Sequence, residues 1–557
     1  MMLINIRRMR ERGLTLKKVI LLFIVFLLVV QLNTKASAID VEAFSDVPTG
    51  HWAEENINTL RQLKVTDGIG DNQYGLGDTL SRAQFVAFLY KLQGWQEMLP
   101  RQESFIDVKS SDWYYGYIET SLEQGVITKV NQAFRPNEAI TREEMAIMIV
   151  RTLGYGWLAE RMNNQTSSFT DVTKNVGYIT MLKDFGIING VGDGRFAPNA
   201  WAKREEAAAI LVRMYEKTNN GLDETNVFYR DNSYGQIDLM QGFDVVSFSW
   251  ADLTLTQDQR IIVENKFPLG YEEPLQKANR ENTEVRLSIY ADDRENLLSN
   301  LLASKETQAQ IITSIMNLLY THPAFDGLAI DFEGLRGSEN RSGFTGFLRA
   351  LDQELSAQAK SLTVMVQPQV YYDGYDYATI NTIADHTIMM AHDFGAKRLT
   401  EAEMAMGITT TPLASLEEVY NALKHLTQAQ KDEEALIKLS LQISFDVAQW
   451  QTNSEGNVVN QSAYSPTYAT LYNRLIDGGT NIAFGATSRN PYASYYNSQT
   501  GLNNVIWYED SRSVAEKIQL AKMFGIYDVS VWRLGNIPNY KDSGDKKVYM
   551  ELMKVLQ

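Results

Sequence analysis

Residues 325–335 read FDGLAIDFEGL, an apolar run that carries three acidic residues, Asp326, Asp331 and Glu333. The aliphatic and aromatic residues predict a β-strand, because such side chains pack well on a half-buried pleated surface. Side chains two positions apart on a strand point to the same face, and Asp331 and Glu333 are about 6.6 Å apart along the chain. The two carboxylates can therefore act together on one ligand.

Short apolar runs of this kind recur after residue 240 and alternate with longer segments of helical periodicity. The runs are VVSFSW, VRLSIYA, FDGLAIDFE, LTVMVQPQ, HTIMMAHDF, IKLSLQISF, TNIAFGA and DVSVWRLG. Strands that alternate with helices favour a parallel sheet, and about eight such units in residues 241–557 predict an α/β TIM barrel. In that fold, functional side chains gather at the carboxyl ends of the strands, where Asp331 and Glu333 are expected to lie.

Upstream of residue 216 the sequence repeats three times, at a period of about 60 residues. The repeats cover residues 44–94, 105–155 and 169–215, and each has two helical patterns joined by a loop that contains glycine. Residues 216–240 are polar and rich in turn formers, which predicts a linker. The expected fold class is therefore multidomain, an all-α repeat unit followed by the barrel.

The second helix of each repeat has a recognisable start. Ser81 with Gln84, and Thr141 with Glu144, fit the capping box, in which each side chain satisfies a backbone N–H at the helix start. Lys203 replaces the capping hydroxyl in the third repeat, which predicts a weaker cap there.

Residues 1–38 are predicted to be a cleaved secretory signal. Six Lys or Arg precede the apolar run VILLFIVFLLVV, and the small-residue site Ala36-Ser37-Ala38 follows it. As a helix, these twelve residues span about 18 Å, less than the ~30 Å hydrocarbon core of a bilayer. An uncleaved membrane anchor is the alternative, and no membrane contact is expected once the signal is removed.

The composition limits the partners that the protein can have. Removing residues 1–38 takes away seven Lys or Arg and one acid, which changes the net charge from −16 to −22. Such a surface disfavours nucleic acid and anionic lipid, and is compatible with neutral glycans. An exported chain of this size without cysteine suits a Gram-positive-type bacterium. The histidines are scattered, so neither a metal site nor a cofactor is predicted.

The three repeats resemble the S-layer homology domain, which anchors exported proteins to the secondary polymer of Gram-positive cell walls. Arg82, Arg142 and Arg204 fall at the arginine of the TRAE motif of that family, and Trp52 and Trp113 at its aromatic position. The resemblance implies a helical pseudo-trimer whose grooves hold an anionic, pyruvylated sugar, with these five residues binding the polymer. A guanidinium at a helix start can bind a carboxylate through two hydrogen bonds.

The third repeat departs from this family pattern at two positions. Lys203 stands at the cap, and Tyr178 lies near the position of the expected Trp. The resemblance therefore implies a weaker binding groove in this repeat.

From residue 241 the chain resembles glycoside hydrolase family 18, particularly its bacterial peptidoglycan- and chitin-type glucosaminidases. Asp326, Gly327, Asp331 and Glu333 match the strand-four signature DGxDxDxE, in which Ala329 replaces the second Asp. Further motifs follow in the family's order: MMAHDF, LQISFDVAQW, VIWYEDSRSVAEKIQLAKMFGI and VSVWRLGNIP. The resemblance implies retaining hydrolysis of β-linked N-acetylglucosamine, with the acetamido oxygen of the substrate as nucleophile and with no cofactor.

The resemblance also implies roles for the acidic residues. Glu333 is expected to protonate the leaving oxygen and then to activate water, with a pKa raised by burial and by its acidic neighbour. Asp331 is expected to orient the acetamide N–H and to stabilise the oxazolinium intermediate. Asp326 is expected to support Asp331 from the start of the strand.

Four further residues complete the expected site. His392 stands where the family has a strand-six Tyr that donates a hydrogen bond to the acetamido oxygen, and an imidazole N–H can make that bond. Trp532 is expected to stack on a sugar ring as the floor of its subsite. Gln367 and Asp393 are the other expected substrate contacts.

The sequence thus predicts a secreted, wall-bound glycosidase that cleaves β-1,4 bonds next to N-acetylglucosamine in peptidoglycan or chitin-like glycans. Its expected partners are the secondary wall polymer and the glycan substrate. The alternative is a catalytically inactive glycan-binding or surface-structural protein. Ala329 and His392 favour that alternative, and the intact Glu333 argues against it.

Overall fold

The computed structural model describes residues 43–556, except residues 130, 259, 281–282 and 410–411. The chain divides into two compact units, one of residues 43–155, 169–173 and 190–213, and the other of residues 156–168, 174–189 and 214–556. The predicted signal, residues 1–38, lies outside the described residues. Within the described ranges, no helix has the length and apolar character that crossing a membrane requires.

The first unit is helical, as the repeats predict. Its helices are α3 (Glu54–Gln62), α4 (Arg82–Gln93), α5 (Tyr115–Glu123), α6 (Arg142–Thr152) and α9 (Arg204–Asn219), whose last residues belong to the second unit. The capping boxes predicted at Ser81 and Thr141 are confirmed. At Lys203 only the backbone half of the cap remains, because its N–H donates to Glu206 at 3.1 Å.

A ring of backbone hydrogen bonds joins the three repeats. Leu80 N–H donates to the carbonyl of Ala202 (3.0 Å), Ala202 N–H to that of Ile140 (2.9 Å), and Ile140 N–H to that of Leu80 (2.9 Å). All three side chains are fully buried. Each repeat therefore contacts both of the others, which confirms the predicted pseudo-trimer.

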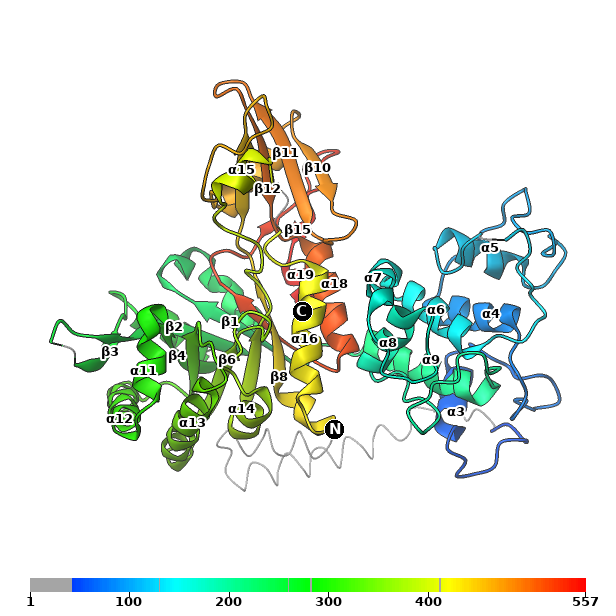
Figure 1. The fold of residues 1–557 in the computed structure, drawn as a ribbon, viewed down its shortest axis with the longest axis horizontal. Helices are drawn as coiled ribbons and strands as arrows, with labels where there is room; N and C mark the ends of the chain where they lie inside the picture. Colours follow the sequence, from blue (N-terminus) through cyan, green and yellow to red (C-terminus); the bar gives the residue numbers. More distant parts are fainter. Residues whose placement is uncertain (1–42, 130, 259, 281–282, 410–411, 557) are drawn as a thin grey trace. The chain divides into compact units, whose positions relative to one another are not determined.

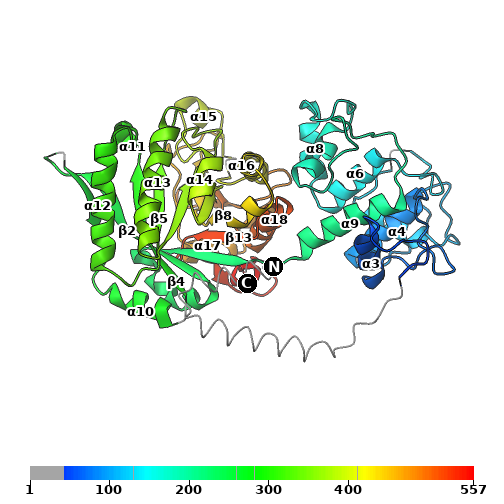
Figure 2. The ribbon, with the colours of Figure 1, turned by 90° about the horizontal axis from the view of Figure 1, so that it is seen from below.

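The second unit contains a closed barrel of eight parallel strands (Figures 1 and 2). Strand β1 pairs with both β13 and β2, which closes the ring. The barrel strands are β1 (Glu224–Tyr229), β2 (Val245–Leu255), β4 (Glu284–Asp292), β5 (Gly327–Glu333), β6 (Ser361–Val366), β7 (His386–Met390), β8 (Leu439–Ser444) and β13 (Asp528–Trp532), and β3 (Ile261–Asn265) adds to β2 in the antiparallel direction.

Helices lie between the strands and cover the outside of the barrel (Figure 2). The helices of the second unit are α7 (Gly156–Arg161), η1 (Met162–Asn164), α8 (Val176–Asp184), η2 (Asp231–Gly242), α10 (Glu272–Arg280), η3 (Arg294–Asn296), α11 (Leu297–Leu302), α12 (Lys305–Thr321), α13 (Asn340–Ala357), α14 (Tyr377–Ile383), α15 (Glu401–Ala405), α16 (Leu416–Gln428), η4 (Glu434–Lys438), α17 (Tyr468–Leu475), α18 (Ser511–Met523) and α19 (Met553–Leu556).

Two predicted boundaries are wrong. Residues 216–240 are not a linker, because they hold the end of α9, the first barrel strand β1 and most of η2. The run TNIAFGA is not a barrel strand. It forms β10 (Asn481–Phe484), which is partly exposed and pairs in the antiparallel direction with β11 (Pro491–Asn497). Barrel strands are covered on both faces, and β1, with five of its six residues buried, meets that condition.

A second sheet is inserted between the last two barrel strands, β8 and β13. Its order is β10-β11-β12-β9, with β12 (Leu502–Trp507) and β9 (Ala448–Thr452), and Figure 1 shows β10, β11 and β12 side by side. Trp450 and Trp507 pack with Leu399 and Val458 in a core of its own. The indole N–H of Trp507 donates to the carbonyl of Thr409 at 2.7 Å, which ties the loop after β7 to this sheet.

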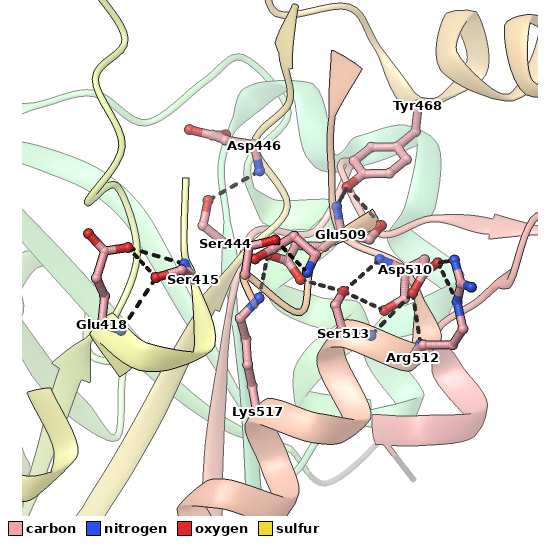
Figure 3. Close-up of polar contacts among 12 residues, drawn as sticks. Ser415, Glu418, Ser444, Asp446, Tyr468, Glu509, Asp510, Arg512, Ser513 and Lys517 are labelled. Atoms are coloured by element: carbon pink, nitrogen blue, oxygen red, sulfur yellow. Dashed lines mark hydrogen bonds and ion pairs between the residues drawn. The ribbon is translucent and has the colours of Figure 1, made fainter. Parts of the chain in front are cut away.

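Buried charges hold the turn from β12 into α18 (Figure 3). Lys517 donates to Glu509 at 2.5 Å, and Ser513 Oγ donates to the other oxygen of Glu509 at 2.6 Å. Asp510 caps α18 by accepting from the backbone N–H groups of Arg512 and Ser513. A buried acid with a paired ammonium and a further hydrogen bond is satisfied in a low-dielectric interior. This turn sets the position of α18, which leads into β13 and Trp532.

Candidate active site

A cavity of about 520 Å³ lies at the carboxyl ends of the barrel strands. It brings together six of the seven residues predicted for catalysis and substrate contact: Asp331, Glu333, Gln367, His392, Asp393 and Trp532. They come from the ends of β5, β6, β7 and β13 or from the residues directly after them. Parallel strands of a barrel end at one face, so segments far apart in sequence meet here.

Asp331 and Glu333 both face the cavity from β5, as their spacing predicts. Asp331 is 1% exposed, and its Oδ1 has no hydrogen-bond partner in the described part of the chain. Burial raises the pKa of Asp331 well above its usual value, and the charge of Glu333 adds to the rise. Ala329, two residues earlier on the same face, is fully buried and offers no polar group.

The pKa of Glu333 is also raised. Burial is the main cause, and the nearby charge of His392 works against it. Gln367 lies beside this acid, with its Nε2 3.5 Å from Glu333 Oε2. The amide oxygen of Gln367 accepts from Gly334 N–H (2.6 Å) and lies 3.1 Å from the Tyr375 hydroxyl, which fixes the orientation of the amide.

His392 is held through both of its ring nitrogens. Nε2 lies 2.8 Å from Gln442 Oε1, and Nδ1 lies 3.2 Å from Asp393 Oδ2. Burial by itself lowers the pKa of His392, but the hydrogen bonds to Asp393 and Gln442 outweigh it, so that the pKa is raised. Both N–H groups are therefore used within the protein. An N–H of His392 would have to leave Gln442 or Asp393 to reach a substrate, and the predicted hydrogen bond to the acetamido oxygen stays a prediction.

A buried polar chain inside the barrel orients Gln442. Gln442 Nε2 lies 3.4 Å from Ser530 Oγ, and Asn226 donates to the same hydroxyl at 3.2 Å. Ser247 Oγ donates to Asn226 Oδ1 at 3.0 Å. With the amide nitrogen directed to Ser530, the amide oxygen of Gln442 is directed to His392.

Lys397 and two acids form a charged wall on the side of β7 and β8. Lys397 Nζ lies 2.7 Å from Asp393 Oδ1 and 3.0 Å from Asp446 Oδ2. Burial alone would raise the pKa of Asp393, but His392 and Lys397 lower it well below its usual range. Asp393 therefore stays ionised and balances both cations.

Sequence reasoning missed several residues of the cavity. Arg230, Tyr290, Tyr371, Phe394 and Asp446 also line it. Strand register could have indicated two of them. Tyr290 pairs with Asp331 across β4 and β5, and Asp446 lies two residues after the buried Ser444 at the end of β8 (Figure 3). Arg230 was hidden because β1 had been assigned to a linker.

Asp326 is not part of the cavity, which corrects its predicted place in the catalytic set. It precedes β5, at the opposite end of that strand from Glu333, and its Oδ2 accepts from Val285 N–H at 3.0 Å. Asp326 therefore holds the start of β5 against β4. The following Gly327 is required by space, because a Cβ there would lie 2.0 Å from Ser361 Oγ on β6.

A second charged cluster lies at the amino ends of the strands. Ligand atoms of Glu224, His386 and Asp528 are within 4.8 Å of one another, a grouping that the scattered histidines of the sequence did not indicate. Arg286, which is 1% exposed, lies 3.7 Å from Glu224 and 2.8 Å from Glu284. The guanidinium supplies positive charge at this place, so the acids need no metal ion to balance them.

In the repeats, the three predicted arginines join neighbouring repeats. The Nε of Arg82, Arg142 and Arg204 donates to the carbonyl of Phe134, Phe196 and Tyr74 respectively, and each guanidinium stacks on the ring of the same residue. All three arginines are buried. Packing between repeats is thus one reason for an arginine at each position.

The three arginines differ in their ion pairs. Arg82 lies 2.6 Å from Glu144, and Arg142 lies 3.4 Å from Glu206. The residue of the first repeat that corresponds to Glu144 and Glu206 is Gln84, which has no charge. Arg204 accordingly forms no ion pair within the described ranges. The predicted aromatic residues are exposed, Trp52 to 59% and Trp113 to 62%.

Models of known protein families match both parts of the chain. The model of Glycosyl hydrolases family 18 matches residues 215–536, and the model of the S-layer homology domain matches residues 43–86, 104–146 and 168–208. Exoglucanase XynX of Acetivibrio thermocellus is 36% identical over 183 residues, 32% of this chain and 16% of that protein. S-layer protein EA1 of Bacillus anthracis is 28% identical over 229 residues, 40% of this chain and 26% of that protein.

Among solved structures, the Bacillus cereus spore cortex-lytic enzyme SleL aligns with 60% of this chain and 74% of its own, at 17% identity and a TM-score of 0.48. The matched region spans about a quarter or less of the length of the two curated relatives above. The first family model covers more than half of the 557 residues. The chain therefore belongs to glycosyl hydrolase family 18, and its N-terminal part carries three S-layer homology domains.

Proposed function

We propose that the protein is a wall-anchored glycosidase that cleaves β-1,4 bonds next to N-acetylglucosamine in peptidoglycan or chitin-like glycans. The observation that carries this proposal is the pair Asp331 and Glu333, two carboxyl groups of raised pKa on one strand, in a cavity that Trp532 also lines. Like charges this close resist joint ionisation, so one of the two keeps a proton to higher pH.

Glu333 is the general acid in this proposal. Its raised pKa favours the protonated form, which donates its proton to the glycosidic oxygen as the bond to C1 breaks. The acetamido oxygen of the sugar that contains this C1 then bonds to C1, which inverts the configuration there and gives an oxazolinium ion. Glu333, now ionised, takes a proton from water, and the water oxygen adds to C1. This step opens the oxazolinium ring, restores the acetamide and inverts C1 a second time, so that the overall reaction retains the configuration.

Asp331 accepts the acetamide N–H, and the positive charge that develops on the oxazolinium favours the ionised form of Asp331, which balances that charge. Its Oδ1 has no partner among the described residues, so a lone pair is available for a substrate N–H. Trp532 offers an apolar face for stacking on the sugar ring. His392 acts as a cation held between Asp393 and Gln442, because both of its nitrogens are used within the protein.

The S-layer homology domains place this activity at the cell surface in our proposal. Arg82, Arg142, Arg204, Trp52 and Trp113 are the proposed contacts with the anionic secondary wall polymer. Secretion through residues 1–38 and a Gram-positive-type host complete the proposal.

A catalytically inactive glycan-binding protein is the second candidate. The observations that favour it are Ala329, which leaves Asp331 Oδ1 without an internal partner, and His392, whose N–H groups are both engaged. In this candidate the cavity would hold a sugar chain without cleaving it.

Mass spectrometry of the products decides between the two. The full-length protein and its Glu333→Gln variant are incubated with purified peptidoglycan and with chitin oligosaccharides, and circular dichroism confirms that both proteins are folded. Fragments that end in a reducing N-acetylglucosamine, from the unmodified protein alone, are expected. Binding without fragments from either glycan would replace the hydrolase with the second candidate.

A further inference from the structure

The charges that line the cavity are unevenly matched. Asp331, Glu333, Asp393 and Asp446 are its acids, and Arg230 and Lys397 are its Lys and Arg cations. Lys397 is neutralised by ion pairs with Asp393 and Asp446, on the side of β7 and β8. Arg230 directly follows β1, three strands away from β7 in the ring.

The charge of Arg230 acts through space on Asp331 and Asp252, where it works against the rise in their pKa. The side chain is exposed, and in the part of the chain that the structure describes its guanidinium forms neither an ion pair nor a hydrogen bond. It contrasts with the buried Arg286 at the other end of the barrel, which is held by Glu284 and Glu224. An arginine that held the fold together would show such contacts.

We propose that Arg230 binds a carboxylate carried by the glycan, so that the active site prefers an acidic N-acetylglucosamine-containing strand to a neutral one. The inference rests on the proposed function and names the substrate class of that site. A guanidinium presents paired N–H donors that match the two oxygens of a carboxylate. The acids on β5, β7 and β8 repel an anion, so the carboxylate is accepted on the β1 side of the cavity alone.

In peptidoglycan strands, the carboxylate borne by the sugar itself is the lactyl group of muramic acid. In strands that carry peptides this group is an amide and has no charge. A reaction that hydrolyses this amide bond must therefore supply the preferred substrate. The product of this amide hydrolysis is a peptide-free strand, which is the substrate that the active site prefers in our proposal.

The experiment compares three substrates with the full-length protein: chitohexaose, peptide-free peptidoglycan strands, and the same strands after conversion of their carboxyl groups to methylamides. The variant is Arg230→Gln. Its matched control is Arg349→Gln, because Arg349 is an exposed arginine of α13 that does not line the cavity. The readout is kcat/KM from the rate at which reducing ends appear.

For Arg230→Gln we expect a loss of about 10- to 100-fold in kcat/KM on the acidic strands, the range for a hydrogen-bonded charged pair. Its loss of kcat/KM on chitohexaose and on the methylamide strands is expected to be several-fold smaller, because there only the through-space effect of Arg230 on Asp331 is removed. Arg349→Gln is expected to match the unmodified protein on all three substrates. An equal loss on all three, or no loss on the acidic strands, would overturn the role of Arg230.

A binding arm keeps this result separate from the proposed hydrolysis. Calorimetric titration of peptide-free strands into Glu333→Gln, with and without Arg230→Gln, measures the carboxylate contact in the absence of turnover. If no substrate is cleaved, the hydrolase proposal fails, and the binding arm still decides the inference. Affinity for acidic strands that does not depend on Arg230 refutes it, and a fall of about tenfold or more supports it.

Discussion

Glu284 at the amino end of β4 is expected to stabilise the barrel through its charge. Its Oε1 accepts from Arg286 Nε at 2.8 Å and from Ser361 Oγ at 3.1 Å. Burial by itself would raise the pKa of Glu284, but Arg286 outweighs burial and lowers the pKa from 4.5 to about 2. The variant Glu284→Gln keeps an oxygen acceptor at this position and removes the negative charge.

The size of the effect follows from this pKa. A tenfold change in an acid constant is about 1.4 kcal/mol, so a fall from 4.5 to about 2 corresponds to ~3 kcal/mol. We reduce this to ~2 kcal/mol because 34% of the Glu284 side chain is exposed and solvent screens the pair. Since the pKa is lower in the folded state, the stabilisation is complete above the unfolded pKa and is lost as the pH falls toward about 2.

Hydrogen exchange of peptides from β4, measured by mass spectrometry, tests this reasoning. At pH 7, Glu284→Gln is expected to exchange about 30-fold faster than the unmodified protein, which is the ratio that ~2 kcal/mol gives. The difference in free energy is expected to shrink by about half at pH 3. Glu354→Gln, an exposed change on α13, is the control and should have little effect. A difference of the same size at both pH values would refute the role of the charge.

Three further outcomes are expected. Gly327→Ala should lower stability by about 1–3 kcal/mol in thermal unfolding, because the new Cβ would lie 2.0 Å from Ser361 Oγ, and Ser361→Ala in the same chain should restore part of the loss. His392→Gln should move the alkaline limb of the pH profile of kcat/KM to higher pH, because it removes a cation that lowers the pKa of Glu333; a shift to lower pH would contradict the assignment. Gln84→Glu should weaken sedimentation with purified cell walls several-fold, because the new carboxylate would pair with Arg204 as Glu144 pairs with Arg82. Lys91→Glu, a change of charge on the same helix, is the control and should leave the sedimentation unchanged.

Local patterns in the sequence were sufficient for much of this account. Helical periodicity and the capping residues Ser81 and Thr141 predicted the second helices of the repeats, because these signals depend on residues three or four positions apart. The period of two in a strand predicted that Asp331 and Glu333 share a face. The order of the motifs also placed His392 and Trp532 at strand ends near one cavity.

Other features depend on contacts between distant parts of the chain. Whether an apolar run joins the barrel or the inserted sheet depends on what covers it, so β1 was taken for a linker and β10 for a barrel strand. The pairing of His392 with Gln442, 50 residues away, changes which groups it can offer to a substrate. The place of Arg230 depends on the fold in the same way, because ring closure brings β1 beside β13 and so puts Arg230 in the same cavity as Trp532.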